Sequence, residues 1–136
     1  MPNLEQTLVY KWLNEVWNKG NIDIAESLMH ENATRHGLGD IDSNLPGPEG
    51  FRTFYANFKK DFTNIDIQME DAIKEDGIEA VRCTVHALHI PTNKEVNFSG
   101  ICWAKCEHGK IKEAWNSFDF LKMYQQIGLL KLSESV

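Results

Sequence analysis

Trp115 and Asp119, near the carboxyl end of the chain, are the residues whose types and spacing most suggest chemistry. They lie four positions apart in a predicted strand, and side chains two or four apart on a strand point to one face. An apolar pocket raises the pKa of a carboxyl group, which suits it to proton transfer. We therefore predict that Asp119 is a catalytic acid and base beside Trp115. Alternatively, Asp119 caps a helix that begins near Phe120.

Histidines supply the next candidates. His36 can hydrogen-bond a ligand carbonyl or relay a proton, since histidine titrates near neutral pH, or it can anchor the loop of residues 37–39. His89 is predicted at a strand end, either as a ligand contact or as a structural or exposed residue. His86 lies near His89 in sequence, but no cysteine or carboxylate stands at a spacing that completes a tetrahedral set. The sequence therefore predicts no metal site.

Length and composition favour one domain over residues 1–136. A chain of 136 residues with 42% hydrophobic and 25% charged residues can bury an ordinary core. No apolar run approaches the roughly 20 residues that span a bilayer, and the amino end lacks a signal-peptide pattern. We expect a cytoplasmic protein without membrane binding.

The net charge and the cysteine content limit which classes of partner and bound metal we expect. The net charge is −6, and Lys59-Lys60 is the one basic pair that stands out, so we predict no nucleic-acid binding. The cysteines Cys83, Cys102 and Cys106 match neither an even disulfide framework nor a CxxC metal motif. They are expected to be reduced thiols packed in the core.

The first half of the chain predicts helices. Apolar residues at three-and-four spacing between positions 8 and 17 indicate an amphipathic helix that Gly20 ends. A short second helix is predicted over residues 22–29, followed by a loop over residues 34–50, which are rich in Gly, Pro, Asn and Asp. Pro48 opens a third helix. One side of that helix carries an aromatic stripe typical of a core: Phe51, Phe54, Tyr55, Phe58 and Phe62.

The second half alternates with period two. Strands are predicted over residues 65–69, 81–87, 96–106 and 111–118, with turns at Gly77, Asn93 and Gly109, and a short helix over residues 121–130. Helices followed by a meandering antiparallel sheet indicate an α+β domain.

Strand parity also predicts an interface. If Gly100 and Cys102 face inward, Ile101 and Trp103 face outward. A large apolar pair on the outer face of a sheet indicates burial by a partner, so we predict a homodimer through this face. The alternative is that a terminal helix covers the pair.

Four segments in consistent order, from near residue 8 to about residue 130, resemble the SnoaL-like polyketide cyclase family. They are Gly47-Pro48-Glu49-Gly50-Phe51-Arg52-Thr53-Phe54-Tyr55, Phe98-Ser99-Gly100-Ile101, Gly109-Lys110-Ile111 with Glu113 and Trp115, and Gln126-Ile127-Gly128-Leu129-Leu130. The resemblance implies a nuclear-transport-factor-2-like (cystatin-like) α+β barrel. In that fold, N-terminal helices wrap a curved antiparallel sheet into a cone with an internal pocket.

The resemblance also implies site residues. In the cyclases, an Asp four residues after the motif Trp is the acid and base of an intramolecular aldol closure, and that position here is Asp119. A His after the second helix faces the pocket, and His36 is its nearest match. Gly100 and Cys102 stand where characterised cyclases carry Gln and His, and His89 is all that remains of a Gly-Thr-His motif. The cyclases' substrate class is therefore not carried over.

The function predicted from these residues needs no cofactor. A small apolar carbonyl compound binds in the pocket, and Asp119 moves a proton next to the carbonyl in an aldol cyclisation or isomerisation. The other predicted pocket residues orient the oxygen or shape the cavity: His36, Tyr55, Trp115, Phe98, Phe51, Cys102 and His89. The alternative is a non-catalytic binding module of the same fold. Epoxide hydrolysis is a third option, but it needs an Arg-bridged pair of acids, and the sequence supplies one acid there.

Overall fold

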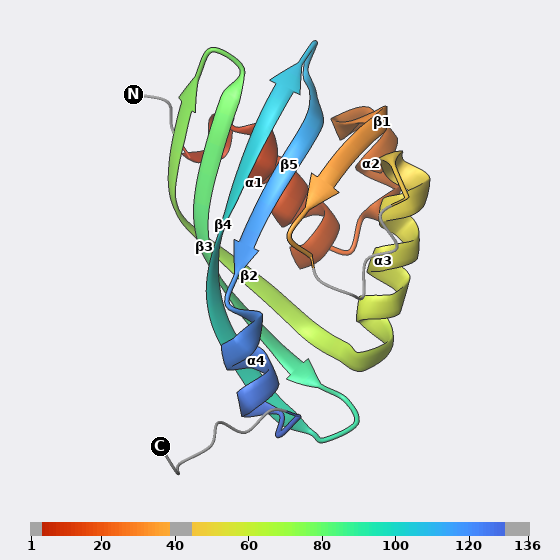
Figure 1. The fold of residues 1–136 in the computed structure, drawn as a ribbon, viewed down its shortest axis with the longest axis vertical. Helices are drawn as coiled ribbons and strands as arrows, with labels where there is room; N and C mark the ends of the chain where they lie inside the picture. The colour runs from red at the N-terminus through yellow and green to blue at the C-terminus, as the bar shows by residue number, and fades with distance from the viewer. Residues whose placement is uncertain (1–3, 39–44, 130–136) are drawn as a thin grey trace.

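Five strands form one curved sheet with the order β1-β5-β4-β3-β2 (Figure 1). The strands are β1 (Met29–His36), β2 (Phe62–Glu75), β3 (Ile78–His89), β4 (Lys94–Glu107) and β5 (Lys110–Phe118). Strands β2 to β5 pair antiparallel, whereas β1 pairs with β5 in parallel. The computed structural model describes residues 4–38 and 45–129, so Gly39 and Leu130 of the predicted loop and last helix lie outside the described residues. Within those ranges the α+β prediction is confirmed, and the sheet is open, with β1 and β2 as its edges.

Two tight hairpins connect the longest strands. Asp76 and Gly77 join β2 to β3 with φ of 51° and 81°, and His108 and Gly109 join β4 to β5 with φ of 54° and 75°. Two-residue loops with positive φ at both positions match the right-handed twist of the strands that they connect. The glycine signals in the sequence therefore correctly marked both turns.

Strand β1 was not predicted. The sequence suggested a helix up to residue 29 and a loop from residue 34, but residues 29–36 form a strand at the sheet edge. Its buried positions are 29, 33 and 35, and its register against β5 shifts between Met29 and Thr34. This irregular spacing hides the period-two signal, and pairing with β5, which is distant in sequence, decides the conformation.

The predicted N-terminal helices are present, although they are broken into short pieces. A single turn η1 (Leu4–Gln6) precedes α1 (Leu8–Trp12), which continues into the π-helical segment η2 (Leu13–Asn18). The turn η3 (Ile22–Ile24) and α2 (Ala25–Leu28) follow. The start of α1 is capped twice. The Thr7 hydroxyl accepts the Tyr10 N–H, and the buried Glu79 carboxylate of β3 accepts the N–H groups of Leu8 and Val9 at 3.0 and 2.9 Å.

The third helix, α3 (Gly47–Asp61), begins one residue before Pro48, close to the predicted start. Phe51, Phe54 and Phe58 are buried on one side of it, whereas Phe62 begins β2 and does not extend the helix. The last helix, α4 (Phe120–Gln126), lies at the end of the sheet where β5 stops (Figure 1). None of the described helices is long and apolar enough to cross a membrane.

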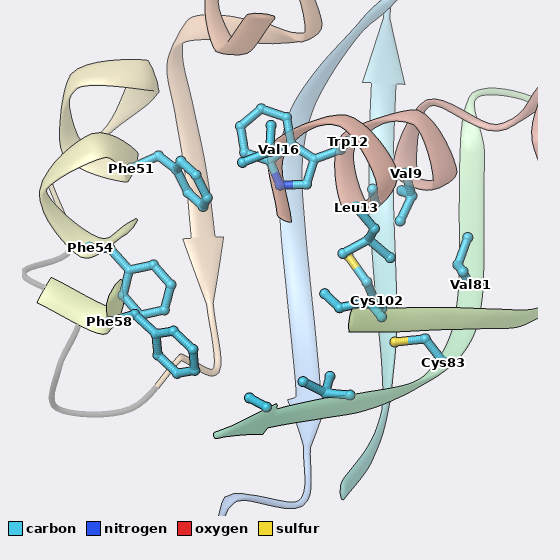
Figure 2. Close-up of a cluster of buried hydrophobic side chains, with 14 of the residues drawn as sticks. Val9, Trp12, Leu13, Val16, Phe51, Phe54, Phe58, Val81, Cys83 and Cys102 are labelled. Carbon is cyan, nitrogen blue, oxygen red and sulfur yellow. The ribbon is translucent and has the colours of Figure 1, made fainter. Parts of the chain in front are cut away.

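The core lies between the inner face of the sheet and the helices. Figure 2 shows the α3 phenylalanines on one side and Trp12 and Leu13 of the N-terminal helix on the other, with Cys102 of β4 beside them. Trp12 and Phe51 meet edge-on, with 4.6 Å between their ring centroids. The helices therefore cover this inner face with rings that border the cavity described next.

Candidate functional site

A cavity of about 100 Å³ lies between the helices and the inner face of the sheet. Its walls come from α1, η2, β1, α3 and all four remaining strands, together with the first residue of α4. The lining residues are Val9, Trp12, Leu13, Trp17, Met29, Arg35, Leu38, Phe51, Phe54, Phe58, Ile65, Ile67, Val85, Phe98, Cys102, Ile111, Ala114, Asn116, Phe118 and Phe120. Among these lining residues, which all belong to the described part of the chain, Arg35 carries a charge and Asn116 an amide, and none is a carboxylate or an imidazole.

Three of the predicted ligand contacts lie on the cavity wall. They are Phe51 of α3 and Phe98 and Cys102 of β4. Gly100 lies between these two β4 residues, and the Phe118 ring occupies the space that a side chain at Gly100 would need. A Cβ atom on Gly100 would lie 2.1 Å from Cδ1 of Phe118. The resemblance to the cyclases implied that Gly100 stands at the position of a glutamine. An aromatic ring from β5 fills the space beside that position.

A β-bulge in β5 determines which side chains enter the cavity. Lys105 of β4 pairs with Glu113, but the next residue, Cys106, pairs with Ile111, so Lys112 is an extra residue in β5. One extra residue reverses the alternation of faces along a strand. Ile111 and Ala114 therefore both line the cavity although they are three residues apart.

Trp115 consequently lies on the outer face, and its predicted place in the pocket is wrong. It pairs with Trp103 across β4 and β5, with ring centroids 5.1 Å apart. Its ring also stacks on His36, and the Lys105 ammonium lies 5.6 Å from its centroid. Ile111 lines the cavity, and in a strand without the bulge Trp115, four positions further on, would share its face.

His36 also lies outside the cavity. It is exposed, pairs in register with Trp115, and its Nε2 lies 2.8 Å from Oε2 of Glu113. Its predicted place in the pocket depended on a loop in this region. Because residues 29–36 form a strand, His36 takes the face opposite to its neighbour Arg35, which lines the cavity.

Asp119 lies just beyond the end of β5 and is not among the residues that line the cavity. Its carboxylate is exposed and accepts the backbone N–H of Lys122 at 3.1 Å as the N-cap of α4. The capping alternative therefore describes the observed geometry. The carboxylate therefore lies in contact with water and not among the apolar residues that line the cavity.

Tyr55 and His89 lie beside the core and not among the cavity-lining residues. The Tyr55 hydroxyl donates to the Val16 carbonyl at 3.3 Å, and burial raises the pKa of Tyr55. His89 is buried at the end of β3, where its Nδ1 lies 2.8 Å from Oγ1 of Thr92 and its ring packs on Phe62. The structural alternative for His89 fits these contacts.

Arg35 and Asn116 are the polar cavity residues that sequence reasoning missed. Arg35 is 8% exposed, and its Nη1 donates to the Leu45 carbonyl at 2.8 Å. The Asn116 amide donates to the His36 carbonyl at 3.1 Å. Arg35 pairs in register with Ala114, so Arg35 and Asn116 sit diagonally on neighbouring strands and face the same side. The signal in the sequence was an arginine in a short polar segment. Its inward direction can be inferred only when that segment is known to be a strand.

The cavity cysteine is not a nucleophile at neutral pH. Burial raises the pKa of the Cys102 thiol to about 12, with smaller contributions from Cys83, Cys106 and Glu79. Burial likewise raises the pKa of Cys83 to about 11 and that of Cys106 to about 12. Thiols with such pKa values stay protonated and behave as small apolar groups. Over the described ranges, no group of three or more His, Cys, Asp or Glu side chains gathers where it could hold a metal ion.

The outer face carries a continuous row, with one residue from each strand in register. We call it the outer belt, and it consists of Ile73, Ala80, Trp103, Trp115 and His36. Ile73 is 70% exposed and Trp103 is 38% exposed, while Ile101 beside the belt is 46% exposed. The predicted outward direction of Ile101 and Trp103 is therefore observed.

Comparisons with known structures identify the same fold. The chain is 25% identical to a candidate polyketide cyclase from Bacillus cereus ATCC 10987, with a TM-score of 0.79 and coverage of 91% of this chain and 80% of that one. It is 19% identical to TsrD from Streptomyces laurentii, with a TM-score of 0.78 and coverage of 93% and 96%. A nuclear-transport-factor-2-like protein of unknown function from Burkholderia pseudomallei gives 14% identity, a TM-score of 0.76 and coverage of 93% and 98%. The comparison with curated protein sequences found no match.

A family model agrees with these structural similarities. The model of the SnoaL-like polyketide cyclase family matches residues 7–127, which is most of the chain. The match includes helices α1 to α4 and every strand of the sheet. This protein therefore belongs to the SnoaL-like polyketide cyclase family.

Proposed function

We propose that this protein binds a small apolar carbonyl compound in the cavity, with the carbonyl oxygen accepting hydrogen bonds from Arg35 and Asn116. The observation that carries the proposal is this polar pair in a cavity otherwise lined by aromatic, aliphatic and thiol side chains. Pockets that bind small molecules commonly combine an apolar lining with a few polar groups that orient the ligand. The absence of a carboxylate or imidazole from the described lining favours binding as the primary function.

The test uses 4-methyl-2-pentanone, a branched ketone small enough for the cavity. In ¹H–¹⁵N NMR titrations, we expect shifts at the Asn116 side-chain amide and the Trp12 and Trp17 indoles. Ala114→Leu, which extends a side chain into the cavity, should abolish these shifts. Ser117→Leu, on the outer face of the same strand, is the matched control and should leave them intact. Unchanged spectra for the wild-type protein would refute the proposal.

A second candidate function is acid and base catalysis by Asp119. The observation that favours it is that Phe118 and Phe120, on either side of Asp119 in the chain, both line the cavity. To meet a bound ketone, the Asp119 carboxylate would have to release the Lys122 N–H and turn toward the cavity. The family's cyclase name agrees with this reaction class. His36, on the outer face, would have no part in this version of the mechanism.

Catalysis can be tested by hydrogen exchange. A catalytic Asp119 accelerates deuterium uptake next to the carbonyl of 4-methyl-2-pentanone in D₂O. Asp119→Asn and Asp119→Ser should remove the acceleration and keep the fold, because both residues cap helices well. Equal exchange rates in the wild-type protein and both variants would exclude Asp119 from catalysis and leave the binding function.

We also propose that the outer belt joins two copies of the chain. Its aromatic and aliphatic residues need an apolar partner surface, and a second copy supplies the same belt. Lys105 and Glu113, in register beside the belt, offer both signs of charge to an inverted copy. The three free thiols suit a reducing compartment, so the predicted cytoplasmic location is retained in this proposal.

A further inference from the structure

One wall of the cavity is a phenylalanine ring that rests on a glycine of the neighbouring strand. Phe118 of β5 pairs in register with Gly100 of β4, which is buried on the inner face of the sheet. A Cβ atom on Gly100 would overlap Cδ1, Cγ and Cε1 of Phe118. Glycine within a strand commonly marks a place where another group approaches the backbone closely. The Phe118 ring therefore takes space along β4 that any larger residue at position 100 would occupy.

Contacts on both strands hold the Phe118 ring in place. The Asp119 N–H donates to the Ser99 carbonyl at 3.0 Å, so the backbone just after Phe118 stays bonded to β4. The centroid of the Phe118 ring lies 6.3 Å from that of Phe98 and 6.0 Å from that of Phe120. A ring that is packed among other rings and against a strand has little freedom to swing aside. Phe118 is therefore a fixed wall of the cavity.

This wall stands between the cavity and the end of the sheet. Phe98, Phe118 and Phe120 all line the cavity, but Phe98 is buried, whereas Phe118 and Phe120 are half-buried. Since β5 ends at Phe118 and α4 begins at Phe120, the two half-buried rings close the cavity at this end. A long ligand can extend in this direction only where a ring is removed.

We infer that the Phe118 ring sets the upper size limit of the ligand and selects acyclic carbonyl compounds over those that carry an aryl ring. The inference rests on the proposed binding function and names its ligand class: ketones and related carbonyl compounds with a short branched tail. The cavity of about 100 Å³ has no room for a phenyl ring in addition to a carbonyl group and its chain, since a cavity of roughly 150 Å³ holds one benzene.

Two methyl ketones with different tails test the inference. 4-Methyl-2-pentanone has a branched aliphatic tail, whereas 4-phenyl-2-butanone carries the same carbonyl head on a chain that ends in a phenyl ring. In NMR titrations followed at the Trp12 and Trp17 indoles, the wild-type protein should bind the aliphatic ketone at least about tenfold more tightly than the aryl ketone. Burial of apolar area alone predicts the opposite order, because the aryl ketone is the larger apolar molecule.

Removal of the ring should admit the aryl ketone. In Phe118→Ala, the phenyl group of the ligand takes the space of the missing ring, so the aryl ketone should bind at least about tenfold more tightly than it binds to the wild-type protein. Phe118→Leu removes less volume and should give a smaller gain, which keeps the test decisive if the alanine variant does not fold. Val96→Ala is the matched control. Val96 is buried on the inner face of β4 and is not among the lining residues, so the ratio of the two affinities should stay unchanged.

A second change on β4 locates the limit. In Gly100→Leu/Phe118→Ala, the leucine enters the space in which the Phe118 ring lies, because the two positions are in register. The double variant should again bind the aliphatic ketone more tightly than the aryl ketone. If the folded double variant kept the full gain for the aryl ketone, the space that admits it would lie elsewhere in the cavity, and the inference would be overturned.

The outcomes separate the inference from the function that it extends. Equal or tighter binding of the aryl ketone by the wild-type protein would overturn the size limit and leave carbonyl binding in place. Folded Phe118→Ala and Phe118→Leu variants that still reject the aryl ketone would overturn the assignment to Phe118. If neither ketone shifts the indole resonances of the wild-type protein, the binding function itself fails, and the inference fails with it.

Discussion

The two faces of the sheet are built from the same strands, and they differ in how deeply their apolar side chains are buried. Along β4, Phe98, Cys102 and Ala104 are buried on the inner face, while Ile101 and Trp103 are exposed between them. The inner face packs on helices and encloses the cavity. The outer face combines the outer belt with surface ion pairs, such as Arg82 with Glu70 and Asp71.

This comparison shows that residue type alone did not identify the site. Trp115, His36 and Asp119 resemble catalytic residues in type, yet all three lie away from the cavity. Arg35 and Asn116, which are next to His36 and Trp115 in sequence, line it. A shift of one residue along a strand moves a side chain to the other face, so the bulge at Lys112 and the strand conformation of residues 29–36 decided the outcome.

The largest expected difference between the faces is in packing. Phe98→Ala removes a buried ring from the inner face and should lower the free energy of unfolding by about 3 to 5 kcal/mol. Ile101→Ala, three residues along the same strand on the outer face, should cost about 0.5 kcal/mol in the monomer. Urea denaturation of both variants at low protein concentration checks this. Similar losses would mean that the outer face is as well packed as the inner one.

A second expected difference is between a buried and an exposed carboxylate in their contribution to stability. Glu79 is 1% exposed and accepts two backbone N–H groups at the start of α1, so Glu79→Gln should destabilise the fold by about 2 kcal/mol through loss of a charged acceptor. The matched control is Glu75→Gln, an exposed position on β2, which should change stability little. Thermal unfolding monitored by circular dichroism measures both. A stable Glu79→Gln variant would show that a single neutral amide oxygen together with the Thr7 hydroxyl suffices to cap α1.

The outer belt should matter for association and not for folding. Trp103→Ser removes a belt ring and should weaken self-association at least about tenfold, or about 1.4 kcal/mol. The control is Trp12→Phe, an inner-face substitution that leaves the belt unchanged. Light scattering over a concentration series reports the molar mass. A wild-type protein that stays monomeric at high concentration would remove the belt as an interface between copies.

The smallest expected effect is on the exposed ion pairs. The pKa of Glu70 is lowered by a hydrogen bond from the Thr84 hydroxyl and by the nearby Arg82 guanidinium. A lowered pKa in the folded state stabilises the fold above the ordinary glutamate pKa, and this contribution disappears as the pH falls through the lowered value. Because Glu70 is exposed, the effect on stability is slight.

NMR titration of the Glu70 carboxyl group tests this assignment. Thr84→Val should raise the pKa of Glu70 towards its ordinary value and remove a small part of the stability at neutral pH. Ser99→Ala, on the strand beside Thr84, is the control and should leave the Glu70 pKa unchanged. An unchanged pKa in Thr84→Val would instead assign the lowering to Arg82 alone.

Much of the fold was predictable because its signals are local. The spacing of Leu8, Trp12 and Val16 indicated the first helix, Pro48 indicated the third, and Gly77 and Gly109 indicated two hairpins. Phe51, Phe98 and Cys102 line the cavity, since their parity and helical spacing are undisturbed. The edge strand β1 was missed because its pairing partner lies about 80 residues away in sequence.

The sequence by itself determined the fold class, the family, the buried phenylalanine stripe of α3 and the outward direction of Ile101 and Trp103. The fold class, the stripe and the outward direction follow from periodicity and turn chemistry, which depend on neighbours within a few residues. The family follows from the resemblance of four sequence segments. Only the tertiary structure decided that Arg35 and Asn116 line the cavity, whereas His36 and Trp115 lie on the outer face of the sheet. That decision depends on the register of β1 and β4 against β5, which long-range hydrogen bonds and one inserted residue establish.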